Sequence, residues 1–245
     1  MINKTHTPGS AIDWTALPLF QGLGSASIDR IQASARRRSY TAGEFIFREG
    51  DMSAGYFVLS GGMVRLYRAN PEGRLHTLSL LRAPSAFNEV AAVDGETNPF
   101  NALSVTAVEV YVISHANVIN LMAGERILMN NALQALAHLN RDYLERLEDM
   151  TFRTIPSRLA KLFLHESSYS DQFCETPSQL TQEEMAAILG TTREVVGRAL
   201  RGLMNAGLLK KRGRYFYIAD PDGLETLAET NDLPQNLTYV KTQET

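Results

Sequence analysis

The segment Thr181–Arg198 has the sequence TQEEMAAILGTTREVVGR, which predicts two helices joined by a tight turn. Thr181 and Glu184 have the spacing of a capping box, in which each side chain accepts a hydrogen bond from the other residue's backbone N–H. The glycine after the first apolar run suits the left-handed conformation that ends a helix. Thr192 then provides the N-cap of a second helix, which we expect to extend to about Asn205.

The second predicted helix has an apolar face and a charged face. The apolar face contains Val196, Ala199, Leu200 and Leu203. The outward positions, from the N-cap onward, are Thr192, Arg193, Glu194, Gly197, Arg198 and Arg201. In a helix-turn-helix, early residues of the second helix enter the DNA major groove, where arginine pairs with guanine and glutamate accepts from the cytosine amino group. We therefore expect Arg193, Glu194 and Arg198 to contact bases. The alternative is a solvated surface with a local Glu194–Arg198 pair.

A basic hairpin is predicted directly after these helices. Leu208–Ile218 has the sequence LLKKRGRYFYI, which indicates a strand, a glycine turn and a second strand. The chain has a net charge of -3, but most basic residues after position 151 lie between Arg193 and Arg214. We expect Lys211 and Arg212 to contact phosphates without reading sequence, whereas a solvated turn is the alternative.

A repeating apolar pattern precedes the predicted helix-turn-helix. Its positions are Met129, Leu133, Leu136, Asn140, Tyr143, Leu147 and Met150. The alternating steps of four and three are typical of a coiled-coil seam, and the polar Asn140 is suited to fixing the register between two chains. A long helix packed on its own domain is the alternative. We favour a dimer because Leu128, Leu139 and Leu144 form a second stripe that would cover the chain's own core.

Short β-rich runs separated by glycines and turn signals fill residues 40–113, a spacing typical of an all-β sandwich or barrel. Thr154–Pro156 marks a boundary, because proline disfavours helix in the preceding residue and is tolerated in a first turn. We therefore predict an α+β protein with four segments. These are an effector-sensing β-barrel (1–120), a dimerisation helix (121–152), a winged helix-turn-helix (153–222) and a polar C-terminal tail (223–245), disordered from Asn231 onward.

Composition excludes several classes of function. No apolar run approaches the about 20 residues of a membrane span, and we expect a soluble cytoplasmic protein without a leader. Cys174 is the single cysteine, so one chain cannot hold a cysteine-ligated iron–sulfur cluster, and we interpret Cys174 as an ordinary small side chain. The scattered histidines contain no His-x-His motif, so a metal-dependent enzyme is not expected.

The residues from Leu180 to Ile218, including TREVVGR at Thr192–Arg198, closely resemble the DNA-binding domain of the cyclic-AMP receptor protein and fumarate–nitrate reduction regulator (CRP/FNR) family. The first half of the chain is similar to the same family through Tyr40–Asp51, Tyr56–Gly62 and Asn70–Gly73. The resemblance implies a cyclic-nucleotide-binding-like jelly roll, a dimerisation helix and a winged helix-turn-helix. It also implies a homodimer, double-stranded DNA with an inverted-repeat operator, and RNA polymerase as partners.

The sequence departs from this family at the sensory site. Members that bind cyclic AMP have a phosphate-binding cassette that begins Gly-Glu-Leu and carries an Arg-Ser pair. The matching segments here are Asn88–Val90 and Asn98–Asn101, in which only Glu89 is retained. A buried phosphate without the arginine would lose a charge-assisted partner. Tyr143 and Leu144 stand where the family has a base-contacting Thr-Ser pair on the dimerisation helix, so those polar contacts are missing as well. We therefore do not expect cyclic-nucleotide binding.

The identity of the effector stays open at this point. The candidate pocket residues are Asn88, Glu89, Val90, Asn98, Phe100, Asn101, Leu136, Tyr143 and Leu144, of which the apolar members would enlarge the pocket. Some family members without the arginine use haem to sense nitric oxide or carbon monoxide, which makes His76, His115 and His138 candidate ligands, although no pair has metal-ligand spacing. A small organic effector and no effector are the alternatives. A nucleotide-binding module that controls a protein partner is a further alternative, against which the helix-turn-helix argues.

Overall fold

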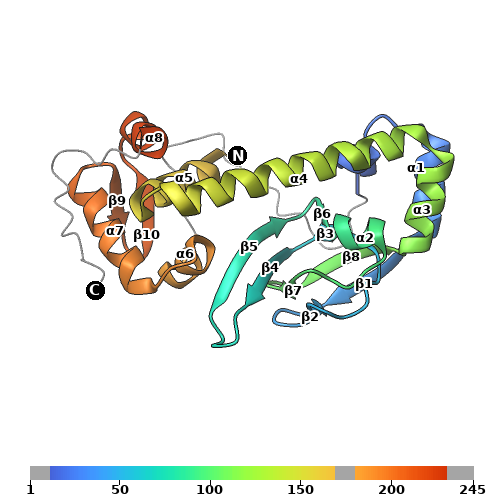
Figure 1. Ribbon diagram of the computed structural model, residues 1–245, viewed down its shortest axis with the longest axis horizontal. Helices are drawn as coiled ribbons and strands as arrows, with labels where there is room; N and C mark the ends of the chain where they lie inside the picture. Colours follow the sequence, from blue (N-terminus) through green and yellow to red (C-terminus); the bar gives the residue numbers. More distant parts are fainter. Residues whose placement is uncertain (1–11, 169–179, 231–245) are drawn as a thin grey trace. The chain divides into compact units, whose positions relative to one another are not determined.

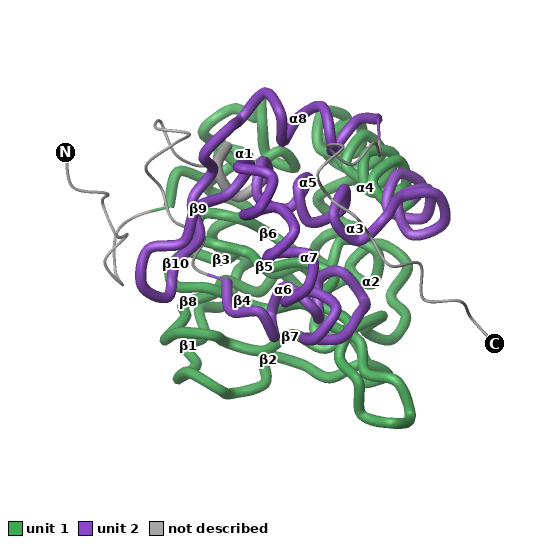
Figure 2. Tube along the Cα trace, turned by 90° about the vertical axis from the view of Figure 1, so that its left-hand side faces the viewer, with its two compact units in different colours: residues 1–143 green, residues 144–245 purple. Residues whose placement is uncertain are grey.

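The computed structural model describes residues 12–168 and 180–230 of the 245-residue chain, so Cys174 and the predicted tail from Asn231 lie outside the described residues. The elements are labelled in Figure 1. The chain forms two compact units, Met1–Tyr143 and Leu144–Thr245, coloured green and purple in Figure 2. None of the described helices has both the length and the hydropathy that a membrane span needs.

Unit 1 contains two antiparallel four-stranded sheets. The first has the strand order β1 (Arg36–Tyr40), β8 (Val108–Ile113), β3 (Tyr56–Gly61) and β6 (Ser85–Phe87). The second has the order β2 (Phe45–Phe47), β7 (Asn101–Ser104), β4 (Met63–Ala69) and β5 (Leu75–Arg82). The predicted β-rich first domain is confirmed, as a pair of sheets that fits a jelly roll rather than as one closed barrel.

Strand β3 is buried on both faces, because each face meets a separate core. Phe57 and Leu59 point into the core between the sheets, where the Phe57 and Phe87 rings stack with centroids 5.1 Å apart. Tyr56 and Val58 alternate with them and pack against the helices of the same unit. This explains why the sequence there is continuously apolar rather than alternating.

Strand β1 lies at one edge of its sheet among the described strands and is strongly basic. Arg36, Arg37 and Arg38 are consecutive and exposed. Their strand pairs with β8, where Arg37 also forms an ion pair with Glu109.

The helices of unit 1 form the second core. They are η1 (Trp14–Ala16), η2 (Pro18–Phe20), α1 (Ser25–Ser34), α2 (Glu89–Asp94), α3 (His115–Gly124) and the first turns of α4 (Arg126–Phe152). The dimerisation helix was predicted from residue 121, but α3 continues to Gly124. Glu125 is extended and pairs with Arg30 of α1, so the long helix begins only at Arg126. Leu128 is buried as predicted for the second stripe, whereas Leu144 is exposed.

Unit 2 contains the predicted winged helix-turn-helix. Its elements are α5 (Ile155–Ser168), α6 (Gln182–Leu189), α7 (Arg193–Asn205), β9 (Leu209–Arg212), β10 (Tyr215–Ile218) and α8 (Pro221–Thr230). The capping box is confirmed: the Thr181 hydroxyl accepts from the Glu184 N–H at 3.2 Å, and the Glu184 carboxylate accepts from the Thr181 N–H at 2.8 Å. Gly190 has a φ of 63° at the end of α6, as the turn requires.

The tail was predicted to start at residue 223, but Pro221–Thr230 forms helix α8 instead. Leu224, Leu227 and Ala228 are buried, and their spacing gives the segment one apolar face. The Asp220 carboxylate accepts from the Gly223 N–H at 3.0 Å and so satisfies a donor at the beginning of this helix.

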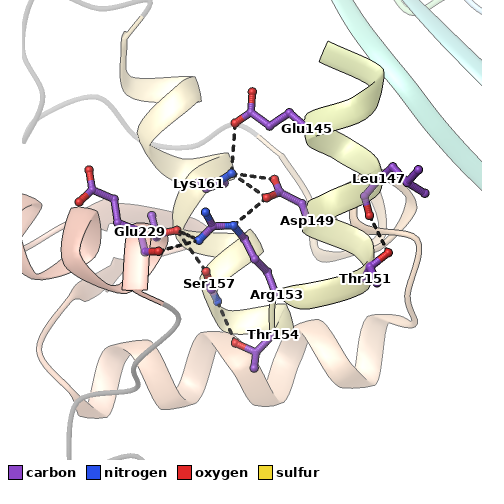
Figure 3. A network of polar contacts seen from close by, with 10 residues as sticks. Glu145, Leu147, Asp149, Thr151, Arg153, Thr154, Ser157, Lys161 and Glu229 are labelled. Atoms are coloured by element: carbon purple, nitrogen blue, oxygen red, sulfur yellow. Dashed lines mark hydrogen bonds and ion pairs between the residues drawn. The ribbon is translucent and has the colours of Figure 1, made fainter. Parts of the chain in front are cut away.

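The break at Thr154–Pro156 is confirmed, since α4 ends at Phe152 and α5 begins at Ile155. Figure 3 shows how polar contacts bind the last turns of α4 to α5. Asp149 accepts from the Lys161 ammonium at 2.7 and 2.9 Å and from Arg153 Nε at 2.7 Å. Arg153 also donates to the Ala228 carbonyl at the end of α8. These contacts place the last turns of α4 in unit 2, although the whole helix to residue 152 was predicted as a separate segment.

We expect the Asp149→Ala variant to lose about 1–3 kcal/mol of unfolding free energy, because the substitution leaves two cations without their mostly buried acceptor. Urea unfolding followed by circular dichroism measures this loss. Glu145→Ala is the matched control: the Glu145 side chain is 68% exposed and contacts the same lysine, so its loss should stay below about 1 kcal/mol. Equal losses in the two variants would contradict the role given to Asp149.

Candidate nucleic-acid interface and effector site

Helix α7 presents a charged face to solvent. Its exposed residues, from the N-cap onward, include Thr192, Arg193, Glu194, Arg198 and Arg201. The opposite face is buried through Val196, Ala199, Leu200 and Leu203, as the sequence predicts. The structure differs from the prediction at one position of this face, Gly197. It was placed on the outward face, but it is buried, since Gln182 Oε1 and Arg201 Nη1 would lie 3.6 and 3.9 Å from a Cβ at that position.

Glu194 is held in its ionised form. Its own backbone N–H and the Thr192 side chain hydrogen-bond the carboxylate and, with Arg193 and Arg198, lower its pKa below the usual value. An ionised carboxylate only accepts hydrogen bonds, so at neutral pH Glu194 is matched to a donor such as a base amino group.

The hairpin of β9 and β10 carries exposed cations at its turn. Lys211 Nζ lies 5.6 Å from the centroid of Phe216, and the Arg212 guanidinium lies 5.7 Å from that of Tyr217. The charged ends thus lie within cation–π range of the rings, and because both residues are exposed they are also suited to phosphate contacts.

Arg158 is a supporting residue that the sequence analysis did not single out. Its Nη2 donates to the Leu189 carbonyl at 2.7 Å, and burial lowers its pKa. Leu189 is the last residue of α6, so this bond fixes the chain directly before the tight turn. No local sequence pattern relates the two residues, since they are 31 positions apart.

In unit 1, two buried asparagines fix the beginning of α2. Asn88 has a φ of 73°, and its amide lies 3.0 Å from each of three acceptors, Ser53 Oγ, the Gly55 carbonyl and Asn98 Oδ1. Asn98 donates in turn to the Arg48 carbonyl at 3.3 Å. Asn88 Oδ1 is buried and accepts from none of the described groups. The two amides therefore fill the space at the N-terminal end of α2.

The structure separates most of the predicted pocket residues. Phe100 packs on Phe47 in the core between the sheets, and Asn101 binds the backbone of Glu49 and Tyr67. Val90, Tyr143 and Leu144 are exposed. The expectation that Phe100, Tyr143 and Leu144 enlarge one pocket is therefore not met, because Phe100 points into a different core and the other two project from α4 into solvent.

Glu89 and Leu136 do line a common cavity. Its enclosed space is only about 10 Å³, room for about one water molecule. Its other lining residues include Leu19, Tyr56, Val118, Met122 and Ala132. Burial among these side chains raises the pKa of Glu89 to about 7 and raises that of Tyr56 as well.

The three candidate haem ligands do not line this cavity. His76 lies on β5, His138 lies on the exposed side of α4, and His115 Nδ1 donates to the Ala92 carbonyl at 2.9 Å. The described residues contain no group of three histidine, cysteine or acidic side chains arranged to hold a metal ion. The geometry gives no support to haem ligation at the cavity.

Comparison with known proteins covers both units. Residues 37–125 match the cyclic nucleotide-binding domain, and residues 157–227 match the Crp-like helix-turn-helix domain. The Cyclic AMP receptor protein of Thermus thermophilus is 28% identical over 193 residues, covering 79% of this chain and 88% of the relative. A CRP-like cAMP-activated global transcriptional regulator of Mycobacterium tuberculosis is 24% identical, covering 84% and 94%. The chain belongs to the CRP/FNR family of transcription regulators.

Solved structures agree with this membership. The Thermus thermophilus Catabolite Activator Protein is 26% identical with a TM-score of 0.52, covering 88% of this chain and all of that one. A crp/fnr family protein from Eubacterium rectale, 22% identical over 86% of this chain and 97% of its own, has a TM-score of 0.69 and shares the fold. The CRP/FNR relatives are transcription regulators rather than enzymes, as the sequence analysis expected.

We expect no saturable binding of cyclic AMP or cyclic GMP at micromolar concentration. Where cyclic-AMP-binding members of the CRP/FNR family carry an Arg-Ser pair, this chain has no cation. A phosphate there would instead meet the unpaired acceptor Asn88 Oδ1, which repels an anion. Calorimetry with each nucleotide measures this directly. A micromolar isotherm would contradict the role given to the asparagine pair.

Proposed function

We propose that the protein is a cytoplasmic homodimeric regulator, that it binds an inverted-repeat operator through α7, and that its sensor unit responds to a ligand other than a cyclic nucleotide. The observation that carries the proposal is the exposed face of α7, where Arg193, Glu194 and Arg198 follow a capped tight turn. RNA polymerase is the further partner that membership in the CRP/FNR family suggests.

The chemistry of α7 specifies the operator. Arg193 and Arg198 are suited to the two acceptors of guanine, and Glu194 to the amino group of cytosine. Each half-site should therefore contain a core anchored by G·C pairs, and the family likeness suggests a sequence similar to GTGA or TTGA. A two-fold dimer doubles this face, so the half-sites should lie about 34 Å apart, one helical turn of DNA.

The apolar stripe of α4 supports dimerisation. The Leu133 and Leu147 side chains are 60% and 61% exposed, and Met129, Tyr143 and Met150 are exposed as well. Asn140 lies in the middle of this stripe and is exposed too. Leu136, the remaining stripe position, is only partly exposed because it also lines the small cavity of unit 1. Exposed large apolar side chains at this spacing are typical of an interface, and a second copy of α4 would bury them. No observation favours the alternative of a module that controls a protein partner.

Two variants test the assignment of α7 and the hairpin. Glu194→Ala should relax selectivity at one base pair by about 1–3 kcal/mol, because it removes a base acceptor. Lys211→Ala should weaken binding to all sequences and reduce its salt dependence, because it removes a phosphate contact. Fluorescence anisotropy against single-base operator changes measures both. If Glu194→Ala weakens every operator equally, Glu194 does not read a base.

A charge on the stripe tests the dimer. Leu133→Glu and Leu147→Glu should each give monomers, because a two-fold interface would bury two facing carboxylates. His138→Glu is the control, since His138 is exposed on α4 but lies outside the stripe, and it should remain dimeric. Sedimentation velocity distinguishes the two states. If both leucine variants remain dimeric, the stripe of α4 is not the dimer interface.

A further inference from the structure

The backbone carbonyl of Leu189, the last residue of α6, has no backbone donor. The N–H groups of Gly190 and Thr191 both donate to the Ala186 carbonyl, the second of them at 3.0 Å. A continuous helix would supply the N–H of Arg193, but Arg193 begins α7 instead. Among the described residues, no backbone N–H donates to the Leu189 carbonyl. A side chain must therefore satisfy this acceptor at a buried residue.

Arg158 supplies the missing donor from α5. Its Nη2 donates to the Leu189 carbonyl oxygen at 2.7 Å, and Asp149 of α4 attracts the same guanidinium. A guanidinium keeps its positive charge at neutral pH, so the bond to the carbonyl is charge-assisted. The cation also lies at the C-terminal end of α6, where the helix dipole favours it. The end of α6 is thus held more firmly than a neutral donor would hold it.

The helix that carries Arg158 is itself well packed. Leu159 and Ala160, the next two residues of α5, are buried. Phe163 of the same helix is buried as well, and its ring centroid lies 6.4 Å from that of Phe216 on β10. The position of the guanidinium is therefore fixed by the core of unit 2, and its hydrogen bond extends that constraint to the end of α6.

The end of α6 is close in sequence to the face that we expect to read bases. Three residues separate Leu189 from the first residue of α7. The N-cap bond of α7 is long, since the Val195 N–H donates to the Thr192 hydroxyl at 3.5 Å. A displacement of the Leu189 carbonyl would therefore pass through this short connection to Arg193 and Glu194.

We propose that Arg158 is a positioning residue for base reading: by holding the end of α6, it sets where α7 presents Arg193 and Glu194 to the major groove. The inference rests on the proposed function and adds a specificity determinant outside the DNA-contacting face of α7. Base contacts depend on the placement of the reading helix, whereas a flexible lysine such as Lys211 still reaches a phosphate after a small displacement. Loss of Arg158 should therefore reduce selectivity more than it reduces affinity for DNA in general.

The test compares Arg158→Gln with Arg153→Gln. Arg153 is the matched control because it caps another helix of the same unit: its Nη1 donates to the Ala228 and Glu229 carbonyls at the end of α8. Both variants remove an arginine from the C-terminal end of a helix, so both should lower the free energy of unfolding. Only Arg158 is bonded to the helix that precedes α7. Selectivity therefore distinguishes a positioning role from a structural one.

Fluorescence anisotropy on the full-length protein measures three affinities: for the operator, for the operator changed at the base pair where Glu194→Ala relaxes selectivity, and for a non-specific duplex. Arg158→Gln should lower the selectivity ratio at that pair at least about fivefold and change the non-specific affinity less than about twofold. Arg153→Gln should leave the ratio unchanged. Arg158→Lys, which keeps a cationic donor, should restore part of the selectivity.

Hydrogen exchange provides a second measurement that needs no operator. Arg158→Gln should speed the exchange of backbone amides at the beginning of α7, whereas Arg153→Gln should speed it at the end of α8. If Arg158→Gln does not fold, Arg158→Lys takes its place in both measurements, with smaller effects in the same direction, since an ammonium group cannot reproduce the geometry of the guanidinium.

The outcomes separate this inference from the proposed function. An unchanged selectivity ratio in Arg158→Gln, or an equal loss in Arg153→Gln, would overturn the inference and leave the regulator in place. If the unmodified protein shows no preference among operators, the proposed base reading is wrong. Faster exchange at the beginning of α7 in Arg158→Gln alone would then still assign Arg158 to holding the turn, and unchanged exchange there would overturn that role too.

Discussion

Helix α4 belongs to both units, because its first turns pack in unit 1 and its last turns are bound in unit 2, and the rest of the structure depends on this constraint. Near its beginning, Leu128 and Ala132 are buried in unit 1, and Leu136 lines the cavity beside α2. Near its end, Asp149 binds Lys161 and Arg153 in unit 2. A helix of 27 residues turns its side chains through every direction, so residues beside each attachment point away from it. The exposed stripe from Met129 to Met150 lies on the side of α4 that neither attachment uses.

The helix-turn-helix could be predicted in detail because its signals are local. The capping box at Thr181, the left-handed Gly190 and the N-cap Thr192 each act within a few residues, and the structure contains all three. The buried face of α7 follows from helical periodicity alone. Gly197 was misplaced because Gln182, a residue on another helix, and the long Arg201 side chain of α7 itself cover it, and periodicity describes neither contact.

The candidate pocket could not be predicted in the same way, because its lining depends on contacts between distant segments. Alignment to a phosphate-binding cassette grouped Glu89, which lines the small cavity beside α2, with Phe100 and Tyr143, which point away from that cavity. The lining from η2, α3 and α4 carries ordinary core residues with no distinctive spacing. Arg158 was missed for a similar reason, since its partner is the backbone carbonyl of Leu189. Helix α8 is a different case: its apolar spacing was visible in the sequence, but the acidic character of the segment obscured it.

Strand β1 has a consequence for behaviour in concentrated solution. An outermost strand offers its backbone groups to any extended segment of another molecule, which is a common route to aggregation. Arg36 and Arg38 project to one side of β1 and Arg37 to the other, because side chains alternate along a strand. Another copy approaching this edge would bring its own three arginines alongside these, so charge repulsion disfavours growth of the sheet from one molecule into the next.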